Sequence, residues 1–145
     1  MIGFGFSKFS GKAAESHTEK YPLPLDVIRF IVNETLDSDK DSWCHFDDEF
    51  ESVWAEVAPD KVGILINLPF PYKENPEIIF QQKDIKVPSS WEIFNFKKKS
   101  FFSSGFITYR TSKGDIDSVI NFIDDFFKKL SQMGYDYKLS GSVNN

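Results

Sequence analysis

The clearest hydrophobic repeat lies near the end of the chain, between Asp115 and Met133. Its apolar residues recur at intervals of three and four, which places them on one wide stripe of a helix. They are Ile116, Val119, Ile120, Ile123, Phe126, Phe127, Leu130 and Met133. Acidic residues begin the segment and two lysines end it, which complements the helix dipole, and Gly134 is a suitable stop. The pattern predicts a long helix whose apolar stripe faces a core.

A second helical pattern follows Pro22 and Pro24 and runs from Leu25 to Leu36. Its apolar residues are spaced as on one helix face, and prolines are common at the start of a helix. The segment also contains several β-branched residues, which would suit a buried strand. We predict a helix here, with a strand as the alternative.

The chain between these two helices predicts mainly strands. The candidates are Lys61 to Phe70, Glu77 to Val87, Trp91 to Phe96 and Phe101 to Arg110, separated by proline and serine residues. The first carries apolar residues on both faces and is therefore expected to be central. Residues 43–57 fit either a helix or a strand. Together these elements predict an α+β fold, a mainly antiparallel sheet packed against an N-terminal and a long C-terminal helix.

The two ends of the chain look less ordered. After the long helix, Tyr135, Tyr137 and Leu139 alternate as in a short strand. Residues 140–145 are expected to form a flexible tail, and residues 1–20 a flexible start. The length of 145 residues predicts a single domain, residues 1–145.

Composition narrows the class of protein. Hydrophobic residues make up 41% and charged residues 27%, as in a globular domain. The net charge of −5 disfavours non-specific adhesion to nucleic acid or to anionic membrane. Cys44 is the single cysteine, residues 1–9 lack the basic start and long apolar run typical of export, and no run of about 18 apolar residues occurs. We therefore expect a cytoplasmic protein.

The strongest functional signal is an acidic and aromatic strip, residues 34–56. It holds nine carboxylates against one lysine, with four large aromatic residues among them. Carboxylates steer the approach of a basic partner, and aromatic rings supply contact energy. The predicted binding residues are Asp39, Asp41, Trp43, Asp47, Asp48, Glu49, Glu51 and Trp54. The two tryptophans would be the anchors if their side chains are exposed, and the expected partner is a folded protein with a basic surface.

Part of this strip resembles a calcium-binding loop. Asp37, Asp39 and Asp41 take the first, third and fifth positions of an EF-hand loop, and Asp48 takes the twelfth. Ser42 stands where the sharp turn requires glycine, and no second loop is present. We therefore predict no metal site.

Two segments combine aromatic residues with features of nucleic-acid binding. Residues 3–9 resemble the core of an RNA-recognition signature, but that signature belongs on an internal strand and here begins the chain. Lys97–Lys99 are flanked by Phe94, Phe96, Phe101 and Phe102, a cluster that could follow a phosphate backbone. Three lysines at a hairpin tip more often form a solvated turn. The expectation is that nucleic acid is not a partner.

Catalytic signals are weak. The histidines are His17 and His45, and neighbouring residues on a strand point to opposite faces, so Cys44 and His45 are poorly placed as a dyad. Zinc-ligand spacing, a glycine-rich phosphate loop and a nucleophile elbow are all absent. We predict that the protein is not an enzyme and holds no cofactor.

In length, acidity, aromatic content and lack of catalytic signatures, the chain resembles the cytoplasmic immunity proteins that bacteria make against toxins. These include the inhibitors of contact-dependent and colicin-like nucleases. The resemblance covers the composition of the whole chain and no motif, so it assigns no residue. It implies a tight inhibitor that covers a basic toxin active site with carboxylates.

The alternative is a secretion-system chaperone. Such chaperones are similar in size and charge, and they bind an effector segment as dimers. The sequence leaves the oligomeric state open.

Overall fold

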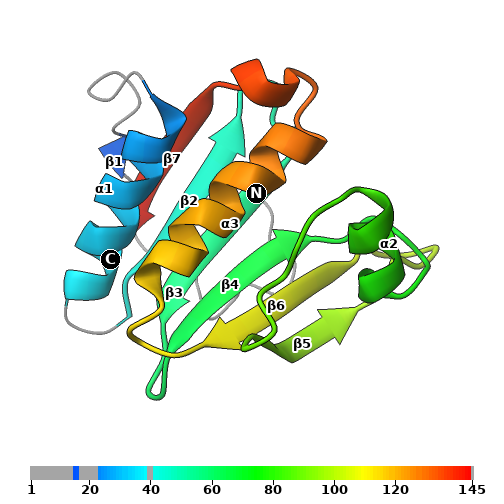
Figure 1. Cartoon of the computed structure of the whole chain (residues 1–145), viewed down its shortest axis with the longest axis horizontal. Helices are drawn as coiled ribbons and strands as arrows, with labels where there is room; N and C mark the ends of the chain where they lie inside the picture. Colours follow the sequence, from blue (N-terminus) through cyan, green and yellow to red (C-terminus); the bar gives the residue numbers. More distant parts are fainter. Residues whose placement is uncertain (1–14, 17–22, 39–40, 145) are drawn as a thin grey trace.

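The computed structural model describes residues 15–16, 23–38 and 41–144 (Figure 1). The elements follow in the order β1 (Glu15–Ser16), α1 (Pro24–Asp37), β2 (Trp43–Asp48), β3 (Trp54–Pro59), β4 (Ile64–Pro69), α2 (Pro76–Gln82), β5 (Glu92–Lys97), β6 (Phe106–Thr111), α3 (Ile116–Leu130), the 3-10 turn η3 (Gly134–Asp136) and β7 (Leu139–Asn144). Within these residues the strands form one sheet in the order β1-β7-β2-β3-β4-β6-β5, with every neighbouring pair antiparallel. The predicted α+β fold is confirmed.

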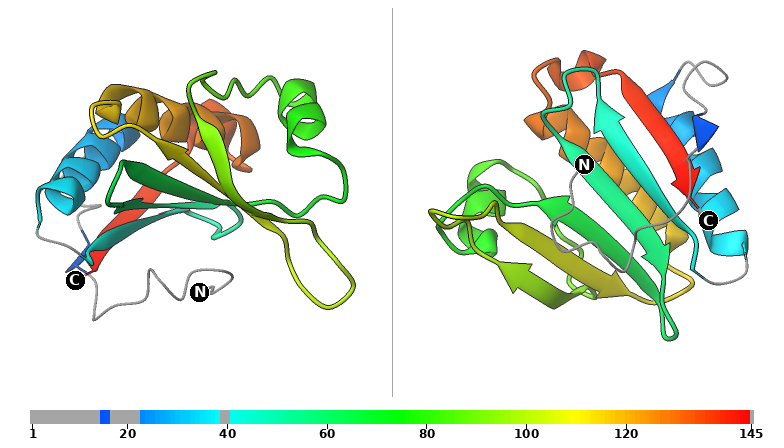
Figure 2. Two further views of the ribbon diagram at one scale, coloured as in Figure 1. Left: turned by 90° about the horizontal axis from the view of Figure 1, so that it is seen from below. Right: turned by 180° about the vertical axis from the view of Figure 1, so that it is seen from behind.

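The helices α1 and α3 lie side by side on one face of the sheet (Figures 1 and 2). Both predicted helices are confirmed, and so is the face that α3 buries: Ile120, Ile123 and Phe127 are fully enclosed. The core between this helix pair and the sheet holds most of the large apolar side chains. The driving force for the architecture is therefore burial of one stripe from each helix against one face of the sheet.

Three of the four predicted strand segments contain strands. Residues 64–69 form β4, which has neighbours on both sides and is buried on both faces, as expected for a central strand. The segments around β5 and β6 are also strands. The ambiguous residues 43–57 hold the β2–β3 hairpin, in which Cys44 lies opposite Val57.

The predicted strand Glu77 to Val87 is wrong, because its first part is the helix α2. Asn75 caps this helix: its side chain accepts a hydrogen bond from the Glu77 backbone N–H at 2.9 Å. Pro76 follows at the first position, where its missing N–H is no loss. The cap signal Asn-Pro-Glu outweighs the strand-like apolar content of the segment.

The expected tail after residue 139 is also wrong. Residues 139–144 form β7, which lies between β1 and β2, while the preceding tyrosine segment contains the turn η3 rather than a strand. Glycine at position 141 suits this strand because a side chain of α1 packs close to it. A Cβ at this position would lie 2.4 Å from the Ile31 side chain. The sequence of this segment has a weak strand signal because a small residue fits best at this position.

No helix in the described ranges combines the length and apolar character required to cross a membrane.

Candidate partner-binding surface

Strand β2 divides the predicted binding strip between two environments. Cys44, Phe46 and Asp48 point toward the helices and are buried. His45 and Asp47 lie on the other face, which confirms that Cys44 and His45 point apart. Burial raises the pKa of the Cys44 thiol to about 12, so this cysteine stays protonated. A nucleophilic role for Cys44 has no support in this geometry.

Asp48 is a structural residue, contrary to the prediction that it faces a partner. Its carboxylate accepts hydrogen bonds from the Ser52 backbone N–H and hydroxyl, both at 2.8 Å, and from the Ser131 hydroxyl at 2.9 Å. The side chain is almost fully buried. Asp48 thereby closes the β2–β3 turn and joins it to the C-terminal end of α3.

The two predicted tryptophan anchors are not exposed rings. Trp54 is 8% exposed and packs with Ala58 and Leu65 in a small apolar cluster. Trp43 is partly buried beside the same cluster. The condition for Trp54 to act as an anchor is therefore not met.

On the face of β2 away from the helices, His45 lies between two carboxylates. Its Nδ1 is 2.7 Å from Glu56 Oε2, and its Nε2 is 2.5 Å from Asp47 Oδ2. Burial opposes a charge on the imidazole, but the hydrogen bonds and negative charges of Asp47 and Glu56 outweigh burial and raise the pKa of His45 to about 9. Burial raises the pKa of Glu56, and its hydrogen bond to His45 opposes that rise. At neutral pH His45 is therefore an imidazolium that donates to both partners.

His45 with Asp47 and Glu56, which we call the histidine clamp, belongs to a row of polar side chains across the middle of the sheet. His45, Glu56, Asn67 and Thr108 are direct neighbours on β2, β3, β4 and β6. The Thr108 hydroxyl donates to Asn67 Oδ1 at 3.0 Å. Glu56, Asn67 and Thr108 are buried. Because the partners are far apart in the chain, no sequence motif could have revealed the row.

One exposed part of the predicted strip lies at the end of the sheet where β2 turns into β3. Glu49 and Glu51 are exposed there, and Phe50 between them is 50% exposed. The segment after α3 reaches the same end (Figure 1). It adds Tyr135, 71% exposed, and the exposed Asp136. We call these five residues the acidic end.

Three contacts hold the two parts of the acidic end together. The buried carboxylate of Asp48 bonds to Ser131, as described above. Asp48 also pairs with Leu139 across β2 and β7. The exposed side chain of Lys138 lies 3.6 Å from Glu49. Exposed rings and carboxylates therefore stand on a fixed support, which lowers the entropy cost of binding.

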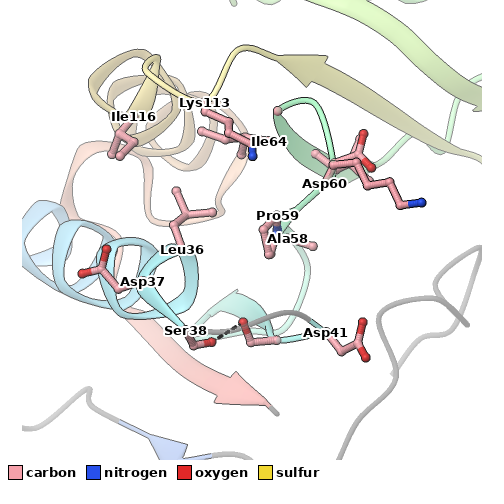
Figure 3. A pocket seen from close by; sticks show the side chains of 14 residues that line it. Leu36, Asp37, Ser38, Asp41, Ala58, Pro59, Asp60, Ile64, Lys113 and Ile116 are labelled. Carbon is pink, nitrogen blue, oxygen red and sulfur yellow. Dashed lines mark hydrogen bonds between the residues drawn. The ribbon is translucent and has the colours of Figure 1, made fainter.

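Asp41 lies apart from the acidic end, at the other end of β2, and Asp39 lies outside the described residues. Asp41 lines a half-open cavity of about 680 Å³ between the end of α1, the β3–β4 turn and the start of α3 (Figure 3). Leu36 and Ile116 contribute apolar surface to this cavity, and lysine and aspartate side chains surround it. Its charges have mixed sign and point to no single ligand.

The structure that follows the calcium-loop pattern differs from that of an EF-hand. The segment that should begin the second helix of an EF-hand is the strand β2, and Asp48 is engaged with Ser52 and Ser131. Within the part of the chain that the structure describes, no three acidic, histidine or cysteine side chains gather as metal ligands.

No protein-family model matches the chain, and no curated protein or solved structure matches it.

Proposed function

We propose that the protein is a binding module that docks its acidic end on a basic surface of a folded partner protein. The observation that carries the proposal is the grouping of two exposed rings, Phe50 and Tyr135, with three exposed carboxylates, Glu49, Glu51 and Asp136. Aromatic side chains supply much of the binding energy in protein interfaces, and surrounding charges select the partner and speed association. The cluster retains an excess of negative charge even after Lys138 offsets one carboxylate.

The partner class we favour is a toxin that a cytoplasmic immunity protein neutralises. A nuclease toxin has a basic active-site surface because it must bind phosphates. The acidic end could cover such a surface with carboxylates in place of the substrate. The compositional resemblance to immunity proteins supports this choice independently of the acidic end.

A secretion-system chaperone is the second candidate, supported by the edge strand β5. This strand is the last one in the described sheet, and Ile93 and Phe94 on it are about half exposed. An extended segment of an effector could add to such an edge. An immunity protein should bind one folded toxin at a one-to-one ratio, whereas a chaperone should be a dimer that binds an unfolded segment.

The decisive experiment is co-purification with the product of the neighbouring gene, followed by titration at several salt concentrations. The test variant is Glu49→Lys with Glu51→Lys. The matched control is Asp41→Lys with Glu74→Lys, which makes the same charge change at exposed sites outside the acidic end. Both variants must still unfold cooperatively.

If the acidic end is the binding surface, the test variant should lose affinity for the partner by about tenfold or more, and its binding should depend less on salt. The control should bind as the wild type does, apart from a small long-range charge effect. Equal losses in the two variants would show that only total charge matters. Unchanged binding of the test variant would refute the acidic end as the binding surface.

A further inference from the structure

The loop between β5 and β6 carries the two most exposed large apolar side chains in the described structure. Phe101 is 92% exposed and Phe102 is 91% exposed. Their ring centroids are 4.8 Å apart, and the rings meet edge to face. Large exposed apolar groups are unfavourable in water, so an adjacent pair indicates a contact surface.

Local hydrogen bonds hold this pair at the tip of the loop. The Ser100 backbone N–H donates to the Ser103 carbonyl at 2.9 Å, and the two hydroxyls are 3.1 Å apart. At the base, the Lys99 N–H donates to the Tyr72 carbonyl at 3.2 Å. Gly105 lies against backbone there, since a Cβ would come within 2.3 Å of a carbonyl oxygen. The phenylalanines are therefore presented by a supported loop.

The same loop is strongly basic. Lys97, Lys98 and Lys99 are exposed, and residues 97–104, which we call the basic finger, contain no acidic residue. None of these three lysines forms an ion pair with a carboxylate in the described ranges. Lys83 adds positive charge near the base, where it lies over the Tyr72 ring. The finger is thus positive although the whole chain carries −5.

We propose that the basic finger is an anchor for an anionic phospholipid surface. Phe101 and Phe102 would insert at the boundary between headgroups and acyl chains, while the three lysines contact anionic headgroups. Apolar insertion and electrostatic attraction each give weak membrane binding alone, and together they give reversible binding. Figure 2 shows the loop projecting beyond the sheet, on the side away from the helices. The tip can therefore reach a flat surface.

The shape of the finger favours a lipid surface over a protein pocket or a nucleic acid. Phe101 and Phe102 project from a single loop between polar sequence neighbours, whereas the centre of a protein interface is a broad and closely packed surface. Successive bases stack on rings that lie in similar planes, but the planes of these two rings are almost perpendicular and form no continuous stacking platform. A fluid lipid surface accepts a small convex apolar tip without a matching cavity. The rest of the chain is negatively charged and is repelled by anionic lipid, so the protein should bind only with the basic finger facing the membrane.

Vesicle co-sedimentation tests the inference with the full chain. The two vesicle types are pure phosphatidylcholine and an equimolar mixture of phosphatidylcholine with phosphatidylglycerol. The wild type should bind the anionic vesicles, prefer them to the neutral vesicles, and dissociate as salt is raised. Replacing both phenylalanines (Phe101→Ser with Phe102→Ser) should reduce partitioning by about tenfold or more. Replacing Lys97–Lys99 with glutamine should remove the preference for anionic lipid.

Matched controls show whether an effect is specific to the finger or follows from the loss of any exposed apolar or basic side chain. Val62→Ser removes an exposed apolar side chain from the turn between β3 and β4, and glutamine at Lys61, Lys86 and Lys113 removes three exposed lysines elsewhere. Both controls should bind vesicles about as the wild type does. The two single serine substitutions in the finger provide a second test if the double variant fails to unfold cooperatively.

Three outcomes would overturn the inference. The first is no partitioning of the wild type at high lipid concentration. The second is a loss in the controls equal to the loss in the finger variants. The third is finger-dependent binding to single-stranded DNA or to a purified partner protein without binding to vesicles. None of these results bears on the acidic end, because the finger variants leave those residues unchanged.

Discussion

The histidine clamp makes stability depend on pH in a direction that can be calculated. The pKa of His45 is raised from 6.5 to about 9 in the folded protein. Its contribution to stability is therefore fully present below the lower value and is lost as pH rises through the higher one. A shift of this size corresponds to about 3 kcal/mol at most. The side chain is 17% exposed, so solvent screening reduces this contribution little.

The assay is urea unfolding of the wild type and of His45→Gln at a series of pH values across that window. The free energy of unfolding of the wild type should fall by roughly 2 to 3 kcal/mol as pH rises. Glutamine carries no titratable proton, so the variant should show a flatter profile. It should also be less stable at neutral pH, by about 3 kcal/mol or more, because Glu56 loses its charged partner while remaining buried.

Subtracting the two profiles removes the contribution of other groups, including the Cys44 thiol, whose raised pKa also favours the unfolded state at high pH. Parallel profiles for the wild type and the variant would refute the assignment of an imidazolium clamp. An unchanged stability at neutral pH would show that Glu56 does not depend on His45.

Four further predictions concern stability. Phe127→Ala should cost about 3 to 5 kcal/mol in urea unfolding because its side chain is fully buried, and a loss below about 1 kcal/mol would contradict that burial. Asp48→Ala should cost about 1 to 3 kcal/mol, since it leaves the buried Val53 N–H and Ser131 hydroxyl without their acceptor, whereas Glu49→Ala should stay within about 0.5 kcal/mol. Gly141→Ala should cost about 1 to 3 kcal/mol through a clash with α1, and thermal melting would reveal it. Calcium should leave the melting temperature unchanged, and a clear rise would reverse the interpretation of the acidic loop.

The two long helices could be predicted because their signal is local. The stripe from Ile116 to Leu130 repeats with the helix period, and charges at its ends match the dipole. The central strand Ile64–Pro69 was visible for a similar reason, since strands buried on both faces are continuously apolar. The helix α2 is also encoded locally, by the cap of Asn75 and Pro76, but the apolar content of the segment resembles a strand and predicts the wrong element.

The strand β7 illustrates what local reasoning cannot reach. Its glycine and serines predict a tail, yet the strand is stable because β1 and β2 pair with both of its edges. The close approach of the buried Ile31 and Phe46 side chains then favours glycine at position 141. Both causes lie far away in the chain, so they contribute no signal to the segment itself.

The candidate sites divide in the same way. The sequence by itself determined that residues 34–56 are acidic and aromatic, and that lysines and phenylalanines cluster near residue 100. Only the tertiary structure decided that Asp48 bonds to Ser52 and Ser131, and that the segment carrying Tyr135 and Asp136 lies beside the β2–β3 turn. The physical reason is strand register: a shift of one residue would exchange the two faces of β2. Exposure and partnership therefore follow from the pairing of distant strands, which no local pattern specifies.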